Sequence, residues 1–403
     1  MNHILISNCQ VKKNKYLKAN RNASRKSEHK IICVGFKTNI YKLMRLESQD
    51  LVDLTHNPNH KISQQIPENK TLILERIRNS EIRGLSGGGF PVYKKIEAVL
   101  EANKDKKYFI INGIECDPGL LHDEWIRRNK LDEVLFGIRA ISKCVNFDRI
   151  ILASRKMVEE MSKPITEKTK KTTEDFSLKS SQNQPQIEDV RLWNQYPLGE
   201  EHILIKKTLG INLKKKEIPA KKGILILNIQ TVLAAAHAVA DGSRITDRYL
   251  IAADLRSGTA KIVKAPLNME ADKVLELAMG KVDHEVSFAG QGLLSSHPIS
   301  RNEKIDYCTN FLAYGEKIWF SDTEACKKCG RCTRKCVQKV QVSKIIGEFS
   351  NGNVTYKPQF GSDNCIGSNA CTYYCKSGIN TKDMVEKYNE KYKKYNKRYQ
   401  EKR

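Results

Sequence analysis

Seven of the twelve cysteines of this 403-residue chain lie between residues 326 and 375. Residues 326–336 read CKKCGRCTRKC, a C-x2-C-x2-C-x3-C run whose spacing wraps a short loop around an iron–sulfur cube. The first three thiolates of such a run bind one cube, and the fourth typically binds a second. This feature therefore predicts an iron–sulfur site and a second cysteine run further along the chain.

The second run is present, with one departure. Residues 365–375 read CIGSNACTYYC, and Ser368 stands where the second cysteine of the run would be. An alkoxide or water ligand at Ser368, a three-iron cluster, and no second cluster at all are open alternatives. Crossed ligation assigns Cys326, Cys329, Cys332 and Cys375 to the first cluster, and Cys336, Cys365 and Cys371 to the second.

A zinc site is the alternative for these cysteines, because tetrahedral thiolate sites also use C-x2-C pairs. Zinc usually takes two such pairs per ion, which explains a nearly intact repeat of the longer run poorly. The remaining cysteines have no partner at ligand spacing, so we expect them to be buried or inert. They are Cys9, Cys33, Cys116, Cys144 and Cys308.

Length and composition limit the class of protein. At roughly 150 residues per domain the chain holds two or three domains. It has no run of about 18 apolar residues, and its N-terminus has no small-residue cleavage site of a secretory signal. We therefore expect a cytoplasmic protein, where reduced cysteines at short spacing are usually metal ligands.

The chain is strongly basic, with 70 Lys and Arg against 46 Asp and Glu and a net charge of +24. Lysine patches bind the phosphates of nucleic acids, but here the basic residues are spread along the chain and no nucleic-acid motif accompanies them. We expect no nucleic-acid partner. An acidic redox partner is the better explanation, because complementary charge speeds electron-transfer encounters.

A glycine-rich loop, GLSGGGFP, occupies residues 84–91. The bare backbone of four glycines can approach a phosphate and present its N–H groups, although Ser86 breaks the order of the dinucleotide-binding fingerprint. A simple glycine-rich turn is the alternative. The helix expected over residues 92–103 carries Lys94 and Lys95, which face either a phosphate or solvent.

Three further segments place polar residues at expected strand ends or helix starts. The strand YFIING, residues 108–113, is followed by Glu115 and Asp117, and ligands bind at strand ends in open α/β sheets. YPLGEEHILIKKTLG, residues 196–210, brings Glu200 and Glu201 to a helix start, where acidic residues are also ordinary partners of the helix dipole. The strand ILIL, residues 224–227, changes at Asn228 into an alanine-rich helix.

From about Ile73 to Ile379 these blocks resemble the flavin-carrying subunit of respiratory complex I and, by their order and their two cysteine runs, the C subunit of Rnf-type electron-transport complexes. The resemblance implies that Glu115, Asp117 and Glu201 orient the nicotinamide and the flavin. It further implies that FMN is bound by Gly84, Gly87, Gly88, Gly89, Phe90, Lys95, Asn112, Tyr196, Glu200, Asn228 and Thr231.

The resemblance also implies the fold: a Rossmann-like α/β flavin-binding domain, a small β-grasp (SLBB-like) domain with short strands such as RYLIAA and AKIVKAP, and an α-helical two-cluster ferredoxin-like domain. The β-rich sandwich with which the Rnf C subunit usually begins is expected to be reduced or lost. The expected divisions are a basic N-terminal region at 1–70, an FMN/NADH-binding domain at 71–242 with an insertion at 160–188, a β-grasp domain at 243–317, a 4Fe–4S dicluster domain at 318–380 and a helical tail at 381–403.

The implied function is electron transfer from NAD(P)H through FMN to 4Fe–4S clusters and on to a redox partner, as an oxidoreductase subunit that meets the inner membrane only through partner subunits. The alternative is a flavin-free iron–sulfur adaptor for a partner reductase, such as an amino-acid or cobalamin reductase. In the tail, Tyr388, Tyr392, Tyr395 and Tyr399 form a stripe on one helical face. We expect it to pack on its own domain, and a docking helix for a partner is the alternative.

Overall fold

The computed structural model describes the part of the chain that follows residue 50, with several gaps. The described residues are 51–55, 62, 65–115, 117, 119–156, 186–193, 196–214, 217–280, 287–293, 295–300, 302–315, 326–352 and 354–400, with the backbone alone at 156, 193 and 392–400.

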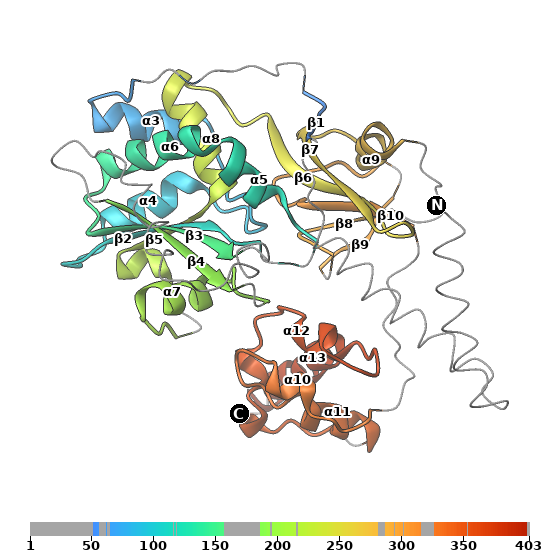
Figure 1. Ribbon diagram of the computed structural model, residues 1–403. Helices are drawn as coiled ribbons and strands as arrows, with labels where there is room; N and C mark the ends of the chain where they lie inside the picture. Colours follow the sequence, from blue (N-terminus) through green and yellow to red (C-terminus); the bar gives the residue numbers. More distant parts are fainter. Residues whose placement is uncertain are drawn as a thin grey trace, which may run out of the picture.

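A four-stranded parallel sheet forms the centre of the first domain (Figure 1). Its order is β4-β3-β2-β5, and its strands are β2 (Tyr108–Gly113), β3 (Arg149–Lys156), β4 (Ile187–Trp193) and β5 (Ile224–Asn228). Helices α3, α4, α6 and α8 cover one face, and α7 covers the other. Their bounds are α3 (Lys70–Asn79), α4 (Val92–Leu100), α6 (Leu131–Cys144), α7 (Glu201–Leu209) and α8 (Ile229–Asp241).

The alternation of side chains along β2 explains why helices lie on both faces. Phe109 and Ile111 pack into the core beneath α3, α4, α6 and α8, whereas Ile110 packs into the separate core beneath α7. Successive residues of a strand point to opposite faces, so a strand that is apolar at every position must be covered twice. The helix α5 (His122–Asn129) follows β2 and starts close to the carboxyl ends of the strands.

A second sheet has six strands in the order β1-β7-β6-β10-β8-β9. These are β1 (Leu51–Asp53), β6 (Asp247–Asp254), β7 (Thr259–Pro266), β8 (Ser287–Gly290), β9 (His297–Pro298) and β10 (Phe311–Tyr314). The helix α9 (Ala271–Met279) packs on the face to which Leu250 and Ala252 point, whereas Tyr249 and Ile251 join the large core of the first domain.

The strand β1 comes from the segment expected to be a separate N-terminal region. Leu51, Val52 and Asp53 pair in parallel with residues 262–264 of β7. The sequence around them does not alternate over enough residues to indicate a strand, and the pairing is made by tertiary contact. The second sheet is therefore completed by residues that lie about two hundred positions away from β7.

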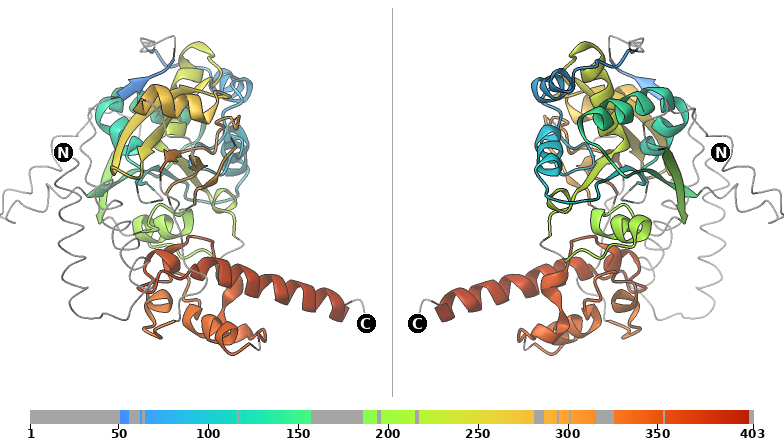
Figure 2. Two further views of the ribbon diagram at one scale, coloured as in Figure 1. Left: turned by 90° about the vertical axis from the view of Figure 1, so that its right-hand side faces the viewer. Right: turned by 90° about the vertical axis from the view of Figure 1, so that its left-hand side faces the viewer.

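The C-terminal part, residues 326–400, forms a small helical unit that we call the cysteine domain. Its core contains Val340, Ile345, Phe360, Val385 and Tyr388. Its helices are α10 (Arg331–Arg334), α11 (Val342–Ser350), α12 (Ala370–Tyr373) and α13 (Thr381–Gln400), with two 3-10 turns, Pro358–Phe360 and Ser362–Asn364. Figures 1 and 2 place this domain beside α7, with the end of α13 extending away from the rest of the molecule.

The tail packs on its own domain, as expected, through its first aromatic residue. Tyr388 is 1% exposed, its hydroxyl donates to the Thr355 carbonyl at 2.8 Å, and its ring stacks near those of Phe360 and Tyr356. The side chains of the other three tyrosines of the stripe are not described. The expected insertion at 160–188 also lies outside the described residues, apart from residues 186–188.

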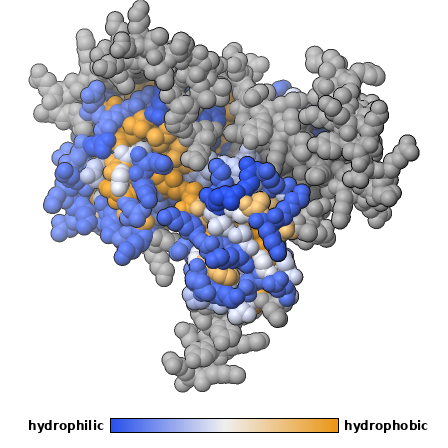
Figure 3. Space-filling view, turned by 60° about the horizontal axis from the view of Figure 1, so that its bottom comes forward, coloured by the Kyte–Doolittle hydropathy of each residue, from blue (hydrophilic) through white to orange (hydrophobic). Residues whose placement is uncertain are grey.

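The predicted elements otherwise match closely in their positions. The strand at 108–113 and the strand that changes to a helix at Asn228 are both present with those bounds, and the helix expected at 92–103 ends at Leu100. Within the described residues no helix has both the length and the apolar character needed to cross a bilayer. Figure 3 brings the cysteine-domain end forward and shows hydrophilic side chains over much of that surface, with hydrophobic areas between them.

Candidate functional site

The glycine loop, residues 84–91, is held at both of its ends and in its middle. Its ends meet through the Gly84 N–H, which donates to the Phe90 carbonyl at 2.9 Å. The Leu85 N–H donates to Thr231 Oγ1 in the first turn of α8 at 3.0 Å, and the Leu85 carbonyl accepts from Arg248 at 3.1 Å. Thr231 thus fixes the loop to the start of α8.

The tip of the loop is open. Gly87 has a φ of +104°, and a Cβ there would lie 2.4 Å from Cδ of Gln291, whose amide donates to the Gly87 carbonyl. A Cβ on Gly88 would meet nothing within 4 Å, and Phe90 is 48% exposed. The space next to Gly88 is therefore free. A loop whose backbone binds a ligand needs such space.

The ends of β2 and β5 meet at what we call the carboxyl edge: residues 112–115, 154–155 and 228 together with the start of α5. Asn228 caps α8, and its side chain donates to Asp123 Oδ2 at 2.7 Å and to the Asn112 carbonyl at 3.3 Å. The Asn112 side chain donates to the Gly199 carbonyl at 2.9 Å. Both asparagines hold the site together through their amides.

Five buried polar atoms at this edge have no hydrogen-bond partner among the described residues. They are Glu115 Oε2, His122 Nδ1, Asp123 Oδ1, Ser154 Oγ and Arg155 Nε. Buried polar groups are almost always satisfied in folded proteins, so a cluster of unsatisfied ones indicates a place for a polar ligand or water. The nearest pairings of these atoms among the described residues are those of Arg155 Nε with Glu115 Oε2 and of Asp123 Oδ1 with His122 Nε2, both at 3.6 Å.

Four of these five residues were missed from the sequence. Only Glu115 was predicted, because it follows a clear strand within a recognisable block. Ser154 and Arg155 end a strand without any sequence motif, and Asp123 and His122 read as the first turn of a helix. The signal that could have found Ser154 and Arg155 is the rule that ligands meet the carboxyl ends of neighbouring parallel strands, applied to β3.

Burial shifts the pKa values of three titratable groups at the carboxyl edge. Desolvation raises the pKa of Glu115, against the nearby Arg155, and raises that of Asp123 well above its ordinary value with the help of the Glu115 charge. Burial lowers the pKa of His122 to about 3, and the Arg248 charge adds to this effect. The imidazole is therefore neutral, and the two carboxyls favour sharing a proton or accepting a cationic or hydrogen-bond-donating group.

Lys95 and the two glutamates of the YPLGEE turn lie beside this edge and make different contacts. Lys95 Nζ donates to Glu201 Oε1 at 2.8 Å and lies 3.4 Å from the Ile226 carbonyl in β5. Glu200 is the N-cap of α7, and its carboxylate accepts the Ile203 N–H at 3.0 Å. The Lys95 ammonium is therefore paired with Glu201, and the Glu200 carboxylate already serves as a helix cap.

Two predicted residues point to other parts of the molecule. Asp117 accepts from the Ser295 hydroxyl at 3.0 Å, so it faces the loop between β8 and β9 of the second sheet. The Tyr196 hydroxyl donates to the Ser368 carbonyl, and its ring lies 6.2 Å from that of Tyr373 in an edge-on contact. Tyr196 is thus a contact between the first domain and the cysteine domain.

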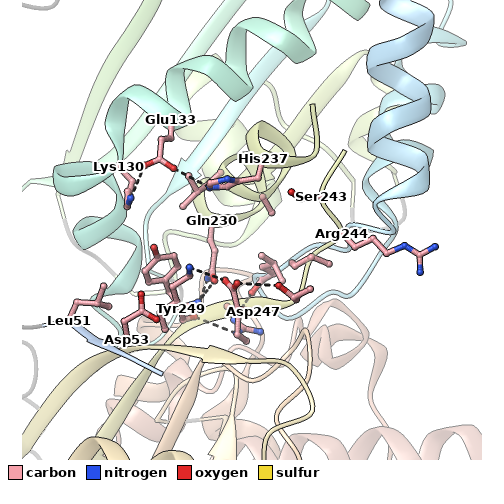
Figure 4. Close-up of a pocket in the computed structure, with 17 residues that line it drawn as sticks. Leu51, Asp53, Lys130, Glu133, Gln230, His237, Ser243, Arg244, Asp247 and Tyr249 are labelled. Atoms are coloured by element: carbon pink, nitrogen blue, oxygen red, sulfur yellow. Dashed lines mark hydrogen bonds and ion pairs between the residues drawn. The ribbon is translucent and has the colours of Figure 1, made fainter. Parts of the chain in front are cut away.

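A cavity of about 450 Å³ lies between α6, α8, β1 and β6, and Leu85 of the glycine loop is one of its lining residues (Figure 4). It contains the ion pairs of Glu133 with Lys130 at 2.7 Å and with His237 at 3.1 Å. No residue predicted from the sequence to bind a cofactor lines it. The orphaned polar atoms and the open glycine loop place the candidate site at the carboxyl edge and not in this cavity.

The two cysteine loops, residues 326–336 and 365–375, have the same backbone shape at an offset of 39 residues. Each has a one-turn helix, α10 or α12, preceded by a left-handed residue, Gly330 (φ 66°) or Asn369 (φ 61°). In both, the threonine after the third cysteine accepts a backbone N–H from the next helix at 2.9 Å. Ser368 occupies in the second loop the position of Cys329 in the first.

The thiols of the two loops lie close enough to influence one another. Burial raises the pKa of Cys332 to about 11, and the charges of Cys371, Cys375 and Cys326 add to the shift. Burial also raises the pKa of Cys371, with contributions from Cys365 and Cys336. Cys332 and Cys371 therefore each have thiols of both loops as neighbours.

The described thiols do not form a site for a single metal ion. Within the described residues no group of three or more His, Cys, Asp or Glu side chains converges closely enough to hold one metal ion. A cube differs because each of its irons takes its own thiolate, so the sulfur atoms surround the group instead of meeting at one point. Of the other cysteines, Cys144 is buried, with its pKa raised to about 11 by burial, and Cys308 is partly exposed.

Comparison with known proteins gives a family model and several relatives. Residues 77–237 match the model of the Nuo51 FMN-binding domain. The C subunit of an ion-translocating oxidoreductase complex of Haemophilus influenzae is 24% identical over 287 residues, which are 70% of this chain and 41% of that protein. The C subunit of the Na⁺-translocating ferredoxin:NAD⁺ oxidoreductase complex of Acetobacterium woodii is 21% identical over 305 residues, 74% of this chain and 63% of that protein.

A solved structure shares the fold at lower identity. The chain aligns with an NAD⁺-reducing NiFe-hydrogenase in its H2-reduced state at a TM-score of 0.55 and 16% identity, over 79% of this chain and 61% of the other. The chain covers less than two thirds of the length of the two relatives named above. The resemblance drawn from the sequence is confirmed: residues 77–237 match a Nuo51-type FMN-binding domain, in a mixed α/β chain similar to the C subunits of ion-translocating oxidoreductase complexes.

Proposed function

We propose that this protein passes electrons from NAD(P)H to a protein partner through FMN at the carboxyl edge and iron–sulfur clusters in the cysteine domain. The observation that carries the proposal is the cluster of five orphaned buried polar atoms beside the open glycine loop, in the region that matches an FMN-binding domain. When bound, FMN exchanges two electrons with a nicotinamide and single electrons with a cluster.

The residues of the edge fit such a ligand by their chemistry. The glycine loop and the first turn of α8 offer backbone N–H groups, which suit a phosphate. Arg155 and Ser154 offer donors, and Glu115 and Asp123 offer acceptors. Lys95 would hold Glu201 in place, so that Glu201 orients the nicotinamide and takes no proton. Glu200 and Asn112 act as structural supports in this scheme, because their polar atoms are already bonded within the protein.

The cysteine domain would receive the electrons at its second loop. Tyr196 lies at the start of the YPLGEE turn and contacts Ser368 and Tyr373, which places the second loop next to the first domain. The first loop carries exposed Lys327, Lys328, Arg334 and Lys335, whereas the second loop, residues 365–375, contains no Lys or Arg. The basic first loop is therefore the side we propose for an acidic partner, and the membrane would be reached only through that partner.

The test is the visible spectrum of the protein purified without oxygen, before and after addition of NADH. The proposal expects flavin bands and a broad iron–sulfur absorption that both bleach. A broad absorption that only dithionite bleaches, with no flavin, would instead assign the chain the role of a flavin-free adaptor. A protein with zinc and no iron would reject both.

The matched variants are Glu201→Gln and Glu217→Gln. Glu201 pairs with Lys95 beside the edge, whereas Glu217 pairs with Lys222 on the far side of the same domain. Glu201→Gln should slow reduction by NADH while dithionite still reduces the clusters, and Glu217→Gln should leave both unchanged. Equal rates of reduction by NADH in the two variants would contradict the proposed role of Glu201.

A second pair of changes tests the partner surface. Replacing Lys327 and Lys328 with Glu reverses their charge and should slow reduction of the partner at low salt but not at high salt.

A further inference from the structure

The two cysteine loops provide an internal comparison, because they share a fold and differ at one ligand position. Their equivalent left-handed residues are Lys328 and Gly367, Gly330 and Asn369, and Lys339 and Gly378. Their backbone hydrogen bonds also repeat: the N–H of the fourth cysteine donates to the carbonyl three residues earlier, at 3.2 Å in the first loop and 3.0 Å in the second.

None of these repeated contacts uses the side chain of the second cysteine position. The first cysteine of each loop accepts a backbone N–H two residues on, from Lys328 and from Gly367, both at 3.4 Å. The threonine contacts lie after the third cysteine. Serine at position 368 therefore leaves the shape of the loop intact and changes the chemistry of one corner only.

The Ser368 side chain is a weaker ligand for iron than a cysteine thiolate. The Ser368 hydroxyl lies 3.5 Å from the Ala370 N–H, and its oxygen is a harder and more basic donor than the sulfur that iron–sulfur cores prefer. The three remaining thiols of the group, Cys336, Cys365 and Cys371, can bind three irons of a cube, one each. One iron would be left with core sulfide and an oxygen ligand.

We propose that Ser368 marks an exchangeable iron position on the second cluster, a site that binds and releases a divalent transition metal while the three thiolate-bound irons stay in place. This inference rests on the proposed function, because it requires a cluster at the second group of thiols. An uncharged core of three irons and four sulfides takes up Fe²⁺ by forming three iron–sulfide bonds and becomes the dicationic cube. Atoms and charge balance, and no electron is exchanged.

The corner at Ser368 lies at the contact between the two domains. Ser368 is the residue whose carbonyl accepts the hydrogen bond of the Tyr196 hydroxyl, so the exchangeable iron lies where the cysteine domain meets the first domain. Cys329, the equivalent corner of the first loop, is exposed and faces no such contact among those described. The weakly held metal therefore sits on the side of the second loop that faces the first domain.

The experiment treats the anaerobically purified protein with EDTA, removes the chelator, and measures iron, sulfide and the EPR spectrum after mild oxidation. The wild type should lose about one iron per chain with all sulfide retained and gain the signal of a three-iron cluster. Reduction with dithionite followed by added Fe²⁺ should then restore the original spectrum. Ser368→Cys should lose no iron, and Cys329→Ser, its mirror image, should lose about two.

The outcomes separate the two proposals. Retention of all iron by the wild type, as in Ser368→Cys, would overturn the exchangeable corner while leaving the clusters in place. Iron and sulfide for a single cluster in both wild type and Ser368→Cys would also overturn it, because the second loop would then hold none. Absence of iron and sulfide from every variant would reject the proposed function itself.

Discussion

The carboxyl edge of the four-stranded sheet and the cysteine domain are built in opposite ways. At the edge, Asn112, Asp123, Asn228 and the glycine loop come from four separate parts of the chain and meet only through tertiary contacts. In the cysteine domain every candidate ligand lies within 50 consecutive positions, and each loop is shaped by its own local hydrogen bonds. The edge is therefore assembled by packing between distant parts of the chain, and the cysteine loops are assembled locally.

This difference predicts how each region fails. The cysteine domain has a modest core, so under the proposed function its stability relies on the clusters it would bind. The larger domain has an extensive apolar core shared with the second sheet, so single changes at the edge should weaken the site without unfolding the domain.

The largest effect is expected from Cys332→Ala, which removes a buried thiol of the first group. We expect loss of the first cluster and unfolding of the cysteine domain. The first domain should keep its own melting transition. Iron analysis and calorimetry measure the two results. Cys308→Ala is the control, since Cys308 belongs to neither loop, and an equal loss of iron in both variants would contradict the grouping of the thiols.

A smaller effect is expected from Thr231→Val, which removes the oxygen that accepts the Leu85 N–H and keeps the shape of the side chain. Leaving that buried N–H without its partner should cost about 1–3 kcal/mol and loosen the glycine loop. Flavin content and the free energy of unfolding in urea measure the outcome. Thr208→Val, which removes a hydroxyl that bonds within α7, should leave flavin content unchanged; a flavin loss of equal size there would speak against the loop.

The acid stability of the edge tests its burial. His122 has its pKa lowered to about 3 from 6.5, so between pH 6.5 and 5 the unfolded chain takes up a proton that the folded protein does not. Stability is therefore lost as the pH falls through this window, by about 2 kcal/mol. The pKa values of Glu115 and Asp123 are raised, so these carboxyls contribute a slope of the opposite sign.

His122→Gln should remove the histidine part of this slope, whereas His297→Gln, at an exposed position, should not change it. Urea unfolding at pH 7, 6 and 5 measures the slope of each variant. Parallel slopes for His122→Gln and the wild type would show that the imidazole is accessible to protons in the folded state.

The smallest effect on stability is expected from Tyr196→Phe, which removes the hydroxyl contact to Ser368 and keeps the ring beside Tyr373. One partly buried hydrogen bond is worth about 1 kcal/mol. Reduction of the flavin by NADH should keep its rate in stopped-flow measurements, and bleaching of the clusters should slow a few-fold. Equal slowing of both steps would place Tyr196 in flavin binding instead of at the domain contact.

The sequence was informative where ligands are consecutive and less so where they are not. The cysteine spacing predicted both loops, and the strand–helix change at Asn228 was located correctly, because both signals are local. Ser154, Arg155 and Asp123 escaped notice because their place at the edge follows from which strands and helices become neighbours. The cap role of Glu200 and the pairing of Lys95 with Glu201 likewise depend on the position of α7.

The second sheet gives the same lesson at the level of the backbone. The strands β6 and β7 were expected from the resemblance to the flavin-carrying family, but β1 has only three residues and owes its conformation to β7. Arg248 is 1% exposed and bonds to the glycine loop, to Asn310 and to the Asp306 carbonyl, so one buried guanidinium joins the glycine loop to the second sheet. A basic residue in an apolar strand gives no sign of such a role in the sequence.

The repeat of the two cysteine loops has a genetic consequence. A cysteine codon becomes a serine codon by a single base change, and the loop tolerates that change because its backbone does not use the second cysteine. A duplicated loop of this kind can therefore acquire a new metal chemistry in one copy through one point mutation, while the other copy preserves the original site.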